Sequence, residues 1–135
     1  MQLSPAALAA LLLALALPAA AAAQSLAPTR GKGPTPSAVK GFRLTVGNPY
    51  RVPMTFTIVP MDPGFARPVK DAEAMPDRLR LAPGRSRQVI LAFRIPVPAR
   101  ERTIGLCVTP EHIAGPVLPR VCGTYTGVVL AGGGG

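Results

Sequence analysis

The stretch RLRLAPGRSRQVILAF, from Arg78 to Phe93, contains the signals on which a fold prediction for this chain rests. An Ala-Pro-Gly sequence separates a short basic run from an alternation of apolar and polar residues. The alternation places Val89, Leu91 and Phe93 on one face, because successive side chains of a β-strand point to opposite faces. Adjacent Pro and Gly are typical of a turn. The stretch therefore predicts two β-segments joined by a turn.

The same alternation recurs along the rest of the chain, in residues 39–46, 52–58 and 103–109. Turn-forming residues lie between these segments, and no segment after residue 24 carries a helical period. Strands at roughly ten-residue spacing predict an all-β, immunoglobulin-like antiparallel β-sandwich of about seven strands. The side chains expected to point inward are Phe42, Leu44, Val46, Val52, Met54, Phe56, Ile58, Val89, Leu91, Phe93, Ile95, Ile104, Leu106 and Val108.

An apolar run, AALAALLLALALPAAAAA, occupies residues 6–23 and ends in three alanines before Gln24. This layout predicts a signal peptide over residues 1–23 with cleavage before Gln24, although the first five residues carry no Lys or Arg. A membrane anchor is the alternative, which we disfavour because a span needs about 20 apolar residues and Pro18 interrupts the run. We therefore expect a periplasmic or secreted protein without a transmembrane segment after cleavage.

The remaining chain divides by composition into three parts. Residues 24–37 are rich in Pro and Gly and predict an extended arm or linker. The predicted β-sandwich covers residues 38–130, and residues 131–135 predict a flexible Gly tail.

The chain is strongly basic, with 15 Lys and Arg against 6 Asp and Glu and a formal net charge of +9. Such a domain approaches anionic surfaces quickly at low salt. Four arginines crowd the turn of the first stretch, and they predict either a basic patch for an acidic ligand or the solvated edge of a sandwich. We favour the second interpretation and expect them to be dispersed. They are Arg78, Arg80, Arg85 and Arg87.

Nucleic acid is a poor fit as a partner. Base stacking needs exposed aromatic side chains. The alternation instead places Phe42, Phe56, Phe93 and Tyr125 inside the sandwich.

Cys107 and Cys122 are the two cysteines of the chain, and an even count in an exported protein predicts a disulfide. The phase of the alternation turns both side chains outward on neighbouring antiparallel strands, so we expect a cross-strand bridge on an outer face. A redox-active pair is the alternative, but the close C-x-x-C spacing is missing. The implied register pairs Gly105 with Thr124 and Thr103 with Thr126.

The sequence offers little for catalysis. His112 is the one histidine, and with Glu111 it falls short of the three or four ligands that a metal site needs. The serines lie in no nucleophile motif, and the acidic residues between 62 and 77 match no calcium-loop pattern. We therefore predict a protein that is not an enzyme and holds neither a metal nor a cofactor.

Read in order, four segments resemble the N-terminal domain of PapD-like periplasmic pilus chaperones. They are Thr29-Arg30, LTVGNPYRVPMTFTI from residue 44, LRLAPGRSRQVILAF from residue 79 and PARERTIGLCVTPE from residue 98. In that family an Asn follows the second strand, an L-x-P-G turn introduces a later strand, and a basic-acidic pair precedes the next. Asn48, residues 81–84 and Arg100-Glu101 match these features, and the resemblance covers residues 29–130.

The resemblance implies a role in binding protein subunits. The family uses two domains and anchors a subunit's C-terminal carboxylate with an Arg near the first strand and a Lys on the last. Arg30 matches the Arg, whereas no Lys lies between Cys122 and Leu130. The family's last strand also contacts the subunit through alternating side chains, which here are Thr124, Thr126, Val128 and Leu130.

The resemblance thus implies a periplasmic, non-enzymatic protein-binding module, an accessory or chaperone-like factor in pilus or surface-structure assembly. Its partner would be a pilin-like or surface subunit. The alternative, suggested by net charge, is a basic envelope domain that binds anionic polymers or lipid headgroups.

Overall fold

The structure is a computed structural model that describes residues 24–113, 115 and 118–131. The predicted signal peptide, residues 1–23, lies outside the described residues, as do residues 132–135 of the predicted Gly tail. Both stay predictions.

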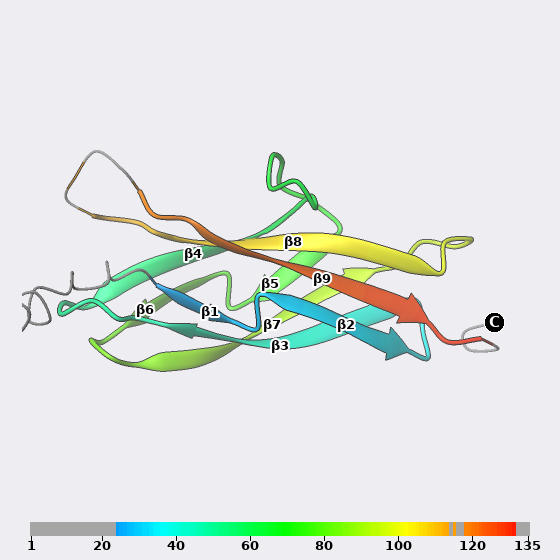
Figure 1. Cartoon of the computed structure of the whole chain (residues 1–135), viewed down its shortest axis with the longest axis horizontal. Coiled ribbons are helices and arrows are strands. Elements are labelled where there is room, and N and C mark those ends of the chain that lie inside the picture. The colour runs from blue at the N-terminus through cyan, green and yellow to red at the C-terminus, as the bar shows by residue number, and fades with distance from the viewer. Residues whose placement is uncertain (1–23, 114, 116–117, 132–135) are drawn as a thin grey trace, which may run out of the picture.

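The described residues form two packed β-sheets without a helix, which confirms the all-β immunoglobulin-like sandwich (Figure 1). One sheet has the strand order β1-β3-β7-β5 and the other the order β2-β9-β8-β4-β6. Neighbouring strands are antiparallel except β2 and β9, which are parallel. The strands are β1 (Ser25–Ala27), β2 (Arg30–Thr35), β3 (Val39–Gly47), β4 (Met54–Met61), β5 (Ala72–Met75), β6 (Arg78–Leu81), β7 (Ser86–Arg94), β8 (Glu101–Pro110) and β9 (Val121–Val129).

The segment 24–37, which the composition separates from the sandwich as an arm, is extended but takes part in both sheets. Strand β1 pairs with β3, and β2 then pairs with β9 of the other sheet. The glycines of β2 allow this strand to lie close to the aromatic rings beneath it, because a Cβ on Gly31 would lie 3.1 Å from ring atoms of both Phe42 and Tyr125. A linker-like composition here reflects a strand that lies directly on aromatic rings. Strands β1 and β2 of this segment bring the number of strands among the described residues to nine, above the expected seven.

The core cluster contains the predicted inward side chains except Phe42, which is partly buried and packs against it, and Val52. Val52 is 55% exposed, because it lies in the loop before β4 begins at Met54. The four predicted inward aromatics all belong to or pack against the core cluster. The Tyr125 hydroxyl donates to the Pro28 carbonyl at 2.6 Å, and burial raises the pKa of Tyr125 to about 12, so the phenol stays protonated as a donor.

The Pro83-Gly84 turn of the opening stretch connects the two sheets. Gly84 has φ of +72°, a conformation that favours glycine, and the Arg85 N–H donates to the Ala82 carbonyl at 3.1 Å. Strand β6 before the turn belongs to the five-stranded sheet, and β7 after it belongs to the four-stranded sheet. The turn is therefore an arch between layers.

Asn48 holds this arch to the end of β3. It is 2% exposed, and its side-chain amide donates to the carbonyls of Val52 at 3.0 Å and Leu81 at 2.9 Å. Its side-chain oxygen accepts the Tyr50 N–H at 2.9 Å. The backbone carbonyl of Asn48 accepts the Gly84 N–H at 2.8 Å. One buried side chain thus fixes both connections at this end of the sandwich.

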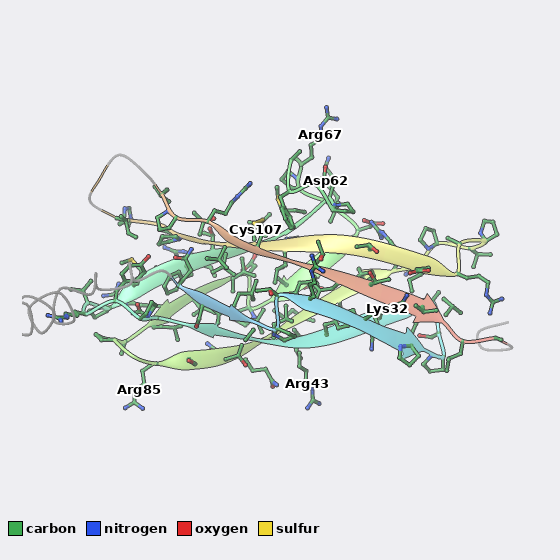
Figure 2. The ribbon with its side chains drawn as sticks, viewed as in Figure 1. Lys32, Arg43, Asp62, Arg67, Arg85 and Cys107 are labelled. Atoms are coloured by element: carbon green, nitrogen blue, oxygen red, sulfur yellow. A yellow bond between two sulfur atoms is a disulfide. The ribbon has the colours of Figure 1, made fainter. Side chains whose placement is uncertain are left out.

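The disulfide between Cys107 and Cys122 is confirmed, with a Cα–Cα distance of 4.1 Å, and so is the predicted register, which pairs Gly105 with Thr124 and Thr103 with Thr126. It lies outside the core cluster, but Cys107 is only 2% exposed. The loop after β4 covers this part of the outer face, since a Cβ on Gly105 would lie 2.7 Å from the Asp62 carbonyl oxygen and 2.8 Å from the Phe65 ring. Figure 2 shows Asp62 and Arg67 on this loop, on the same side as Cys107.

Candidate functional site

The outer face of β2 and β9 brings together three of the five residues that the sequence predicts to contact a partner. Arg30 lies opposite Thr124, and Lys32 lies opposite Thr126. These side chains and Gly31 line a depression of about 310 Å³. We call this surface, defined by Arg30, Lys32, Thr124 and Thr126, the β2–β9 face.

The charges of the β2–β9 face are accessible. Lys32 Nζ lies 3.5 Å from a carboxylate oxygen of Glu101, but both side chains are more than half exposed, so this ion pair is weak. Arg30 forms no ion pair within the described residues. The Thr126 and Thr103 hydroxyls are hydrogen-bonded at 2.6 Å. The face therefore offers two cations and neighbouring hydroxyls to an external anion.

Two apolar positions continue the row along β9. Val128 lies between Pro34 of β2 and Glu101 of β8 and is half-buried. Leu130 follows the strand, is 46% exposed, and donates its N–H to the Thr35 carbonyl at 3.0 Å. Along the outer face of β9, the hydroxyls that lie beside the two cations are thus followed by the apolar side chains of Val128 and Leu130.

Lys32 is the residue that sequence reasoning missed. The family resemblance implies a second cation on the last strand, where no Lys lies between Cys122 and Leu130. Because β2 is parallel to β9, Lys32 lies beside Thr126 instead. Basic residues alternate with glycine at positions 30–33, which is compatible with a strand that has both cations on one face. The same composition is also typical of a linker, so the strand is recognised only once its pairing with β9 is known.

Strand β2, not β9, is the free edge of the five-stranded sheet. The carbonyls of Thr29 and Thr35 accept the N–H groups of Thr124 in β9 and of Leu130 directly after it. In a parallel ladder alternate residues direct their backbone groups to the same side, so Arg30 and Lys32 direct theirs away from β9. Pro34 has no N–H to offer. The unpaired backbone and the cationic side chains therefore belong to the same two residues.

The four arginines of the opening stretch do not share one sheet face. Arg78 and Arg80 lie on β6, whereas Arg85 and Arg87 lie in the turn and at the start of β7 in the other sheet. Arg78 is already engaged, because its guanidinium donates to both carboxylate oxygens of Glu111 and holds the pKa of Glu111 below its ordinary value.

Replacing Arg85 and Arg87 with Gln is expected to leave binding of a protein partner nearly unchanged. Both side chains are exposed and distant in the topology from the β2–β9 face. The free energy of unfolding should change by at most about 0.5 kcal/mol per site. Titration of the partner at two salt concentrations checks this. A large loss of affinity that shrinks as salt rises would instead identify a functional electrostatic site.

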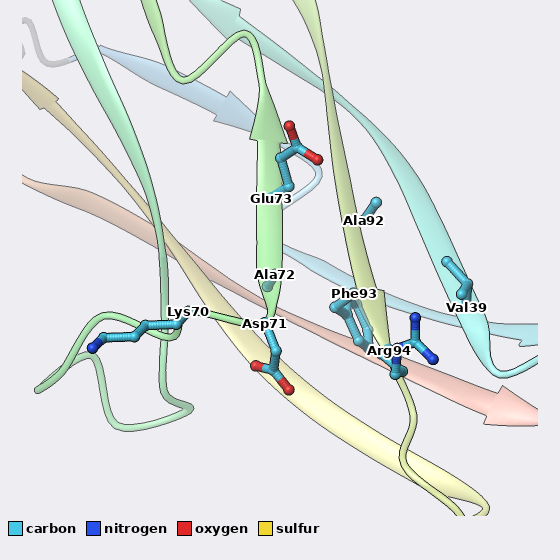
Figure 3. A pocket seen from close by; sticks show the side chains of 8 residues that line it. All are labelled: Val39, Lys70, Asp71, Ala72, Glu73, Ala92, Phe93 and Arg94. Atoms are coloured by element: carbon cyan, nitrogen blue, oxygen red, sulfur yellow. The ribbon is translucent and has the colours of Figure 1, made fainter.

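A second hollow, of about 390 Å³, lies over β5, β7 and the start of β3 (Figure 3). On its rim the Arg102 side chain of β8 donates to both Asp71 carboxylate oxygens at 2.8 Å and to the Arg94 carbonyl at 2.7 Å. These bonds lower the pKa of Asp71, so they support the fold at neutral pH and are lost as the pH falls through that lowered value. No His, Cys or Ser is among the lining residues, and we assign the site a structural role.

Across the described part of the chain, no group of three or more His, Cys, Asp or Glu is placed to hold a metal ion. The same residues include no helix that is long and apolar enough to cross a membrane.

Comparison with solved structures supports the fold. The chain is similar to the E. coli chaperone DraB, with a TM-score of 0.64, 20% identity, and coverage of 79% of this chain and 55% of that one. It is similar to a chain in the complex of the Salmonella enterica SafA pilin with the SafB chaperone, with a TM-score of 0.63, 17% identity and coverage of 79% and 54%. A PapD-like domain of human CEP192 gives a TM-score of 0.59, 12% identity and coverage of 79% and 84%.

These likenesses show that the chain has the PapD-like immunoglobulin fold. It spans about half the length of the chaperone chains that it matches. No protein-family model matches the sequence, and no curated protein matches it by sequence.

Proposed function

We propose that this chain is a non-enzymatic protein-binding module, an accessory or chaperone-like factor in the assembly of pili or other surface structures, and that it works in the periplasm or outside the cell. The observation that carries the proposal is the pair of accessible cations, Arg30 and Lys32, on the free edge strand of a PapD-like sandwich. The solved neighbours DraB and SafB are chaperones, and SafB was solved with a pilin, which supports a pilin-like subunit as the partner class.

In this proposal the β2–β9 face receives the C-terminal carboxylate of the subunit. Arg30 is suited to bind both carboxylate oxygens, because a guanidinium presents two parallel N–H donors. Lys32 adds a point charge, and the hydroxyls of Thr124 and Thr126 lie beside the two cations. Val128 and Leu130 would then meet apolar side chains that precede the carboxylate.

The backbone of β2 gives the partner a second means of attachment. An extended segment of the subunit can pair with the outward N–H and C=O groups of Arg30 and Lys32, as in other cases of strand addition. Pro34 limits this pairing to the first half of β2. Side-chain charge and backbone pairing therefore act at the same place and orient the chain end.

Replacing Arg30 with Gln is expected to weaken the complex about 10- to 100-fold, because a hydrogen bond to a charged group contributes roughly 1.5–3 kcal/mol. The measurement is co-expression with candidate pilin-like subunits from the same genome, followed by copurification and titration of the subunit that is retained. Arg43→Gln is the matched control, since Arg43 is an exposed arginine on β3 of the opposite sheet (Figure 2). Equal losses for both variants, or no loss for Arg30→Gln, would contradict the proposal.

A further inference from the structure

One end of the sandwich gathers several loops that lie far apart in the sequence. Residue pairings place Ser25, Gly47 and Ser86 side by side, and Met54 lies opposite Leu81. The loops 48–53 and 82–85 therefore leave the sheets together. The start of the β8–β9 connection lies beside them, because the Glu111 N–H donates to the Thr55 carbonyl at 2.9 Å. This is the left-hand end of Figure 1.

Five exposed arginines surround this end, on four different segments. The one acid in these loops, Glu111, is already engaged by Arg78. Within the described residues, the other arginines at this end form no ion pair with a carboxylate, so the end carries a net positive charge. We call it the arginine end, and its members are Arg51, Arg80, Arg85, Arg87 and Arg120.

Two exposed apolar side chains lie among these arginines. Val52 follows Arg51 and is 55% exposed, and Leu118 is 49% exposed and two residues from Arg120. Apolar loop residues flanked by arginines suit the surface of a bilayer, where arginines meet lipid phosphates and the apolar groups reach the acyl boundary. A polyanion in solution would use the charges but would leave Val52 and Leu118 in water.

The N-terminal segment joins the sandwich at the same end. The Gln24 side-chain amide is 2% exposed and donates to the carbonyls of Val108 at 2.8 Å and Pro119 at 2.6 Å. Gln24, the first residue that the structure describes, is therefore fixed at the arginine end.

We propose that the arginine end docks on the surface of a bilayer that contains anionic phospholipid, with Val52 and Leu118 at the interface. Two observations favour a bilayer over other partners: the exposed arginines are complementary in charge to anionic lipid, and the apolar side chains of Val52 and Leu118 are exposed beside them. This inference is independent of subunit binding by the β2–β9 face, which lies along the side of the sandwich.

A single tryptophan can report this contact, because the chain has none of its own. Val52→Trp places the reporter at the arginine end, and Val97→Trp places a control at an 83% exposed position between β7 and β8, at the opposite end. Each variant of the exported protein, with its own N-terminus, is mixed with phosphatidylglycerol-containing vesicles whose acyl chains carry bromine. We expect quenching and a blue shift for the V52W variant and no change for V97W.

The arginines are tested in the V52W background. Removing Arg51 and then Arg120 by substitution with Gln should raise the lipid concentration for half-maximal quenching about five-fold per residue. Raising the salt should act in the same direction. The matched control removes Arg43 and Arg67, which Figure 2 shows projecting elsewhere, and should change nothing.

Three outcomes would overturn the inference: equal quenching at both ends, equal quenching by uncharged phosphatidylcholine vesicles, or no effect of removing Arg51 and Arg120. Inorganic polyphosphate is the competing probe. If it binds as tightly as the vesicles at matched charge, the ligand is a soluble polyanion and the bilayer assignment is wrong. Copurification of a pilin-like subunit is unaffected by any of these results, so the two proposals fail separately.

Discussion

Asn48→Ala is expected to lower the free energy of unfolding by about 3 kcal/mol. The substitution removes two donors and leaves the carbonyls of Val52 and Leu81 without their partners, at a site where Asn48 is 2% exposed. An unsatisfied buried polar group costs about 1–3 kcal/mol, and the bond to the Tyr50 N–H is lost as well. Urea unfolding followed by circular dichroism gives the change as a shift of the midpoint.

Asn48→Asp separates the contributions. The carboxylate keeps an acceptor for the Tyr50 N–H but offers no donor to Leu81, so it should recover only a small part of the lost stability. A loss below about 1 kcal/mol for Asn48→Ala, within the range of a single ordinary hydrogen bond, would show that the arch does not depend on this side chain.

Removing the disulfide is expected to cost a similar amount. The bridge closes a loop with a sequence separation of 15, which corresponds to about 3 kcal/mol in the chain-entropy model. That is a large share of the 5–15 kcal/mol that is typical of a whole domain. The Cys107→Ala, Cys122→Ala double variant should therefore unfold at markedly lower urea concentration than the wild type.

The double variant also separates a structural bridge from a redox role. Below its unfolding transition it should bind the partner like the wild type, because the β2–β9 face lies further along β9 than Cys122. If the double variant unfolds at the same urea concentration as the wild type but no longer binds the partner, the bridge does not have a structural role.

The strands with strict alternation could be predicted from the sequence. Leu44, Phe56, Leu91 and Leu106 are buried as expected, because one face of each strand packs against the other sheet. The same phase argument placed Cys107 opposite Cys122 and Thr103 opposite Thr126. Local periodicity is enough where a strand is long and one of its faces is buried.

Features that depend on the approach of distant segments could not be predicted in this way. Gly31 and Gly33 read as linker residues, although they let β2 lie on Phe42 and Lys40. The loop after β4 covers Gly105 with the Phe65 ring, and no periodicity in the sequence indicates this contact. The arginine end combines loops separated by many residues, so its members appear in the sequence as unrelated charges.

Fold similarity alone does not decide the function. The same architecture occurs in the chaperone DraB and in a domain of human CEP192, with similar TM-scores. Function is carried by particular sites on a shared framework. For this chain we propose that the deciding site is the β2–β9 face, because it combines accessible cations with a free strand edge.

The most direct measurement is a double-mutant cycle between Arg30 and the C-terminal carboxylate of the retained subunit. The subunit is prepared with its natural end and with two added glycines, and each form is titrated against the wild type and Arg30→Gln. If Arg30 binds the carboxylate, extending the subunit weakens the wild-type complex and has little further effect on the variant, which gives a coupling energy of 0.5–3 kcal/mol on the order seen for contacting groups. Additive losses, with no coupling, would contradict the assignment of Arg30 to the subunit's carboxylate.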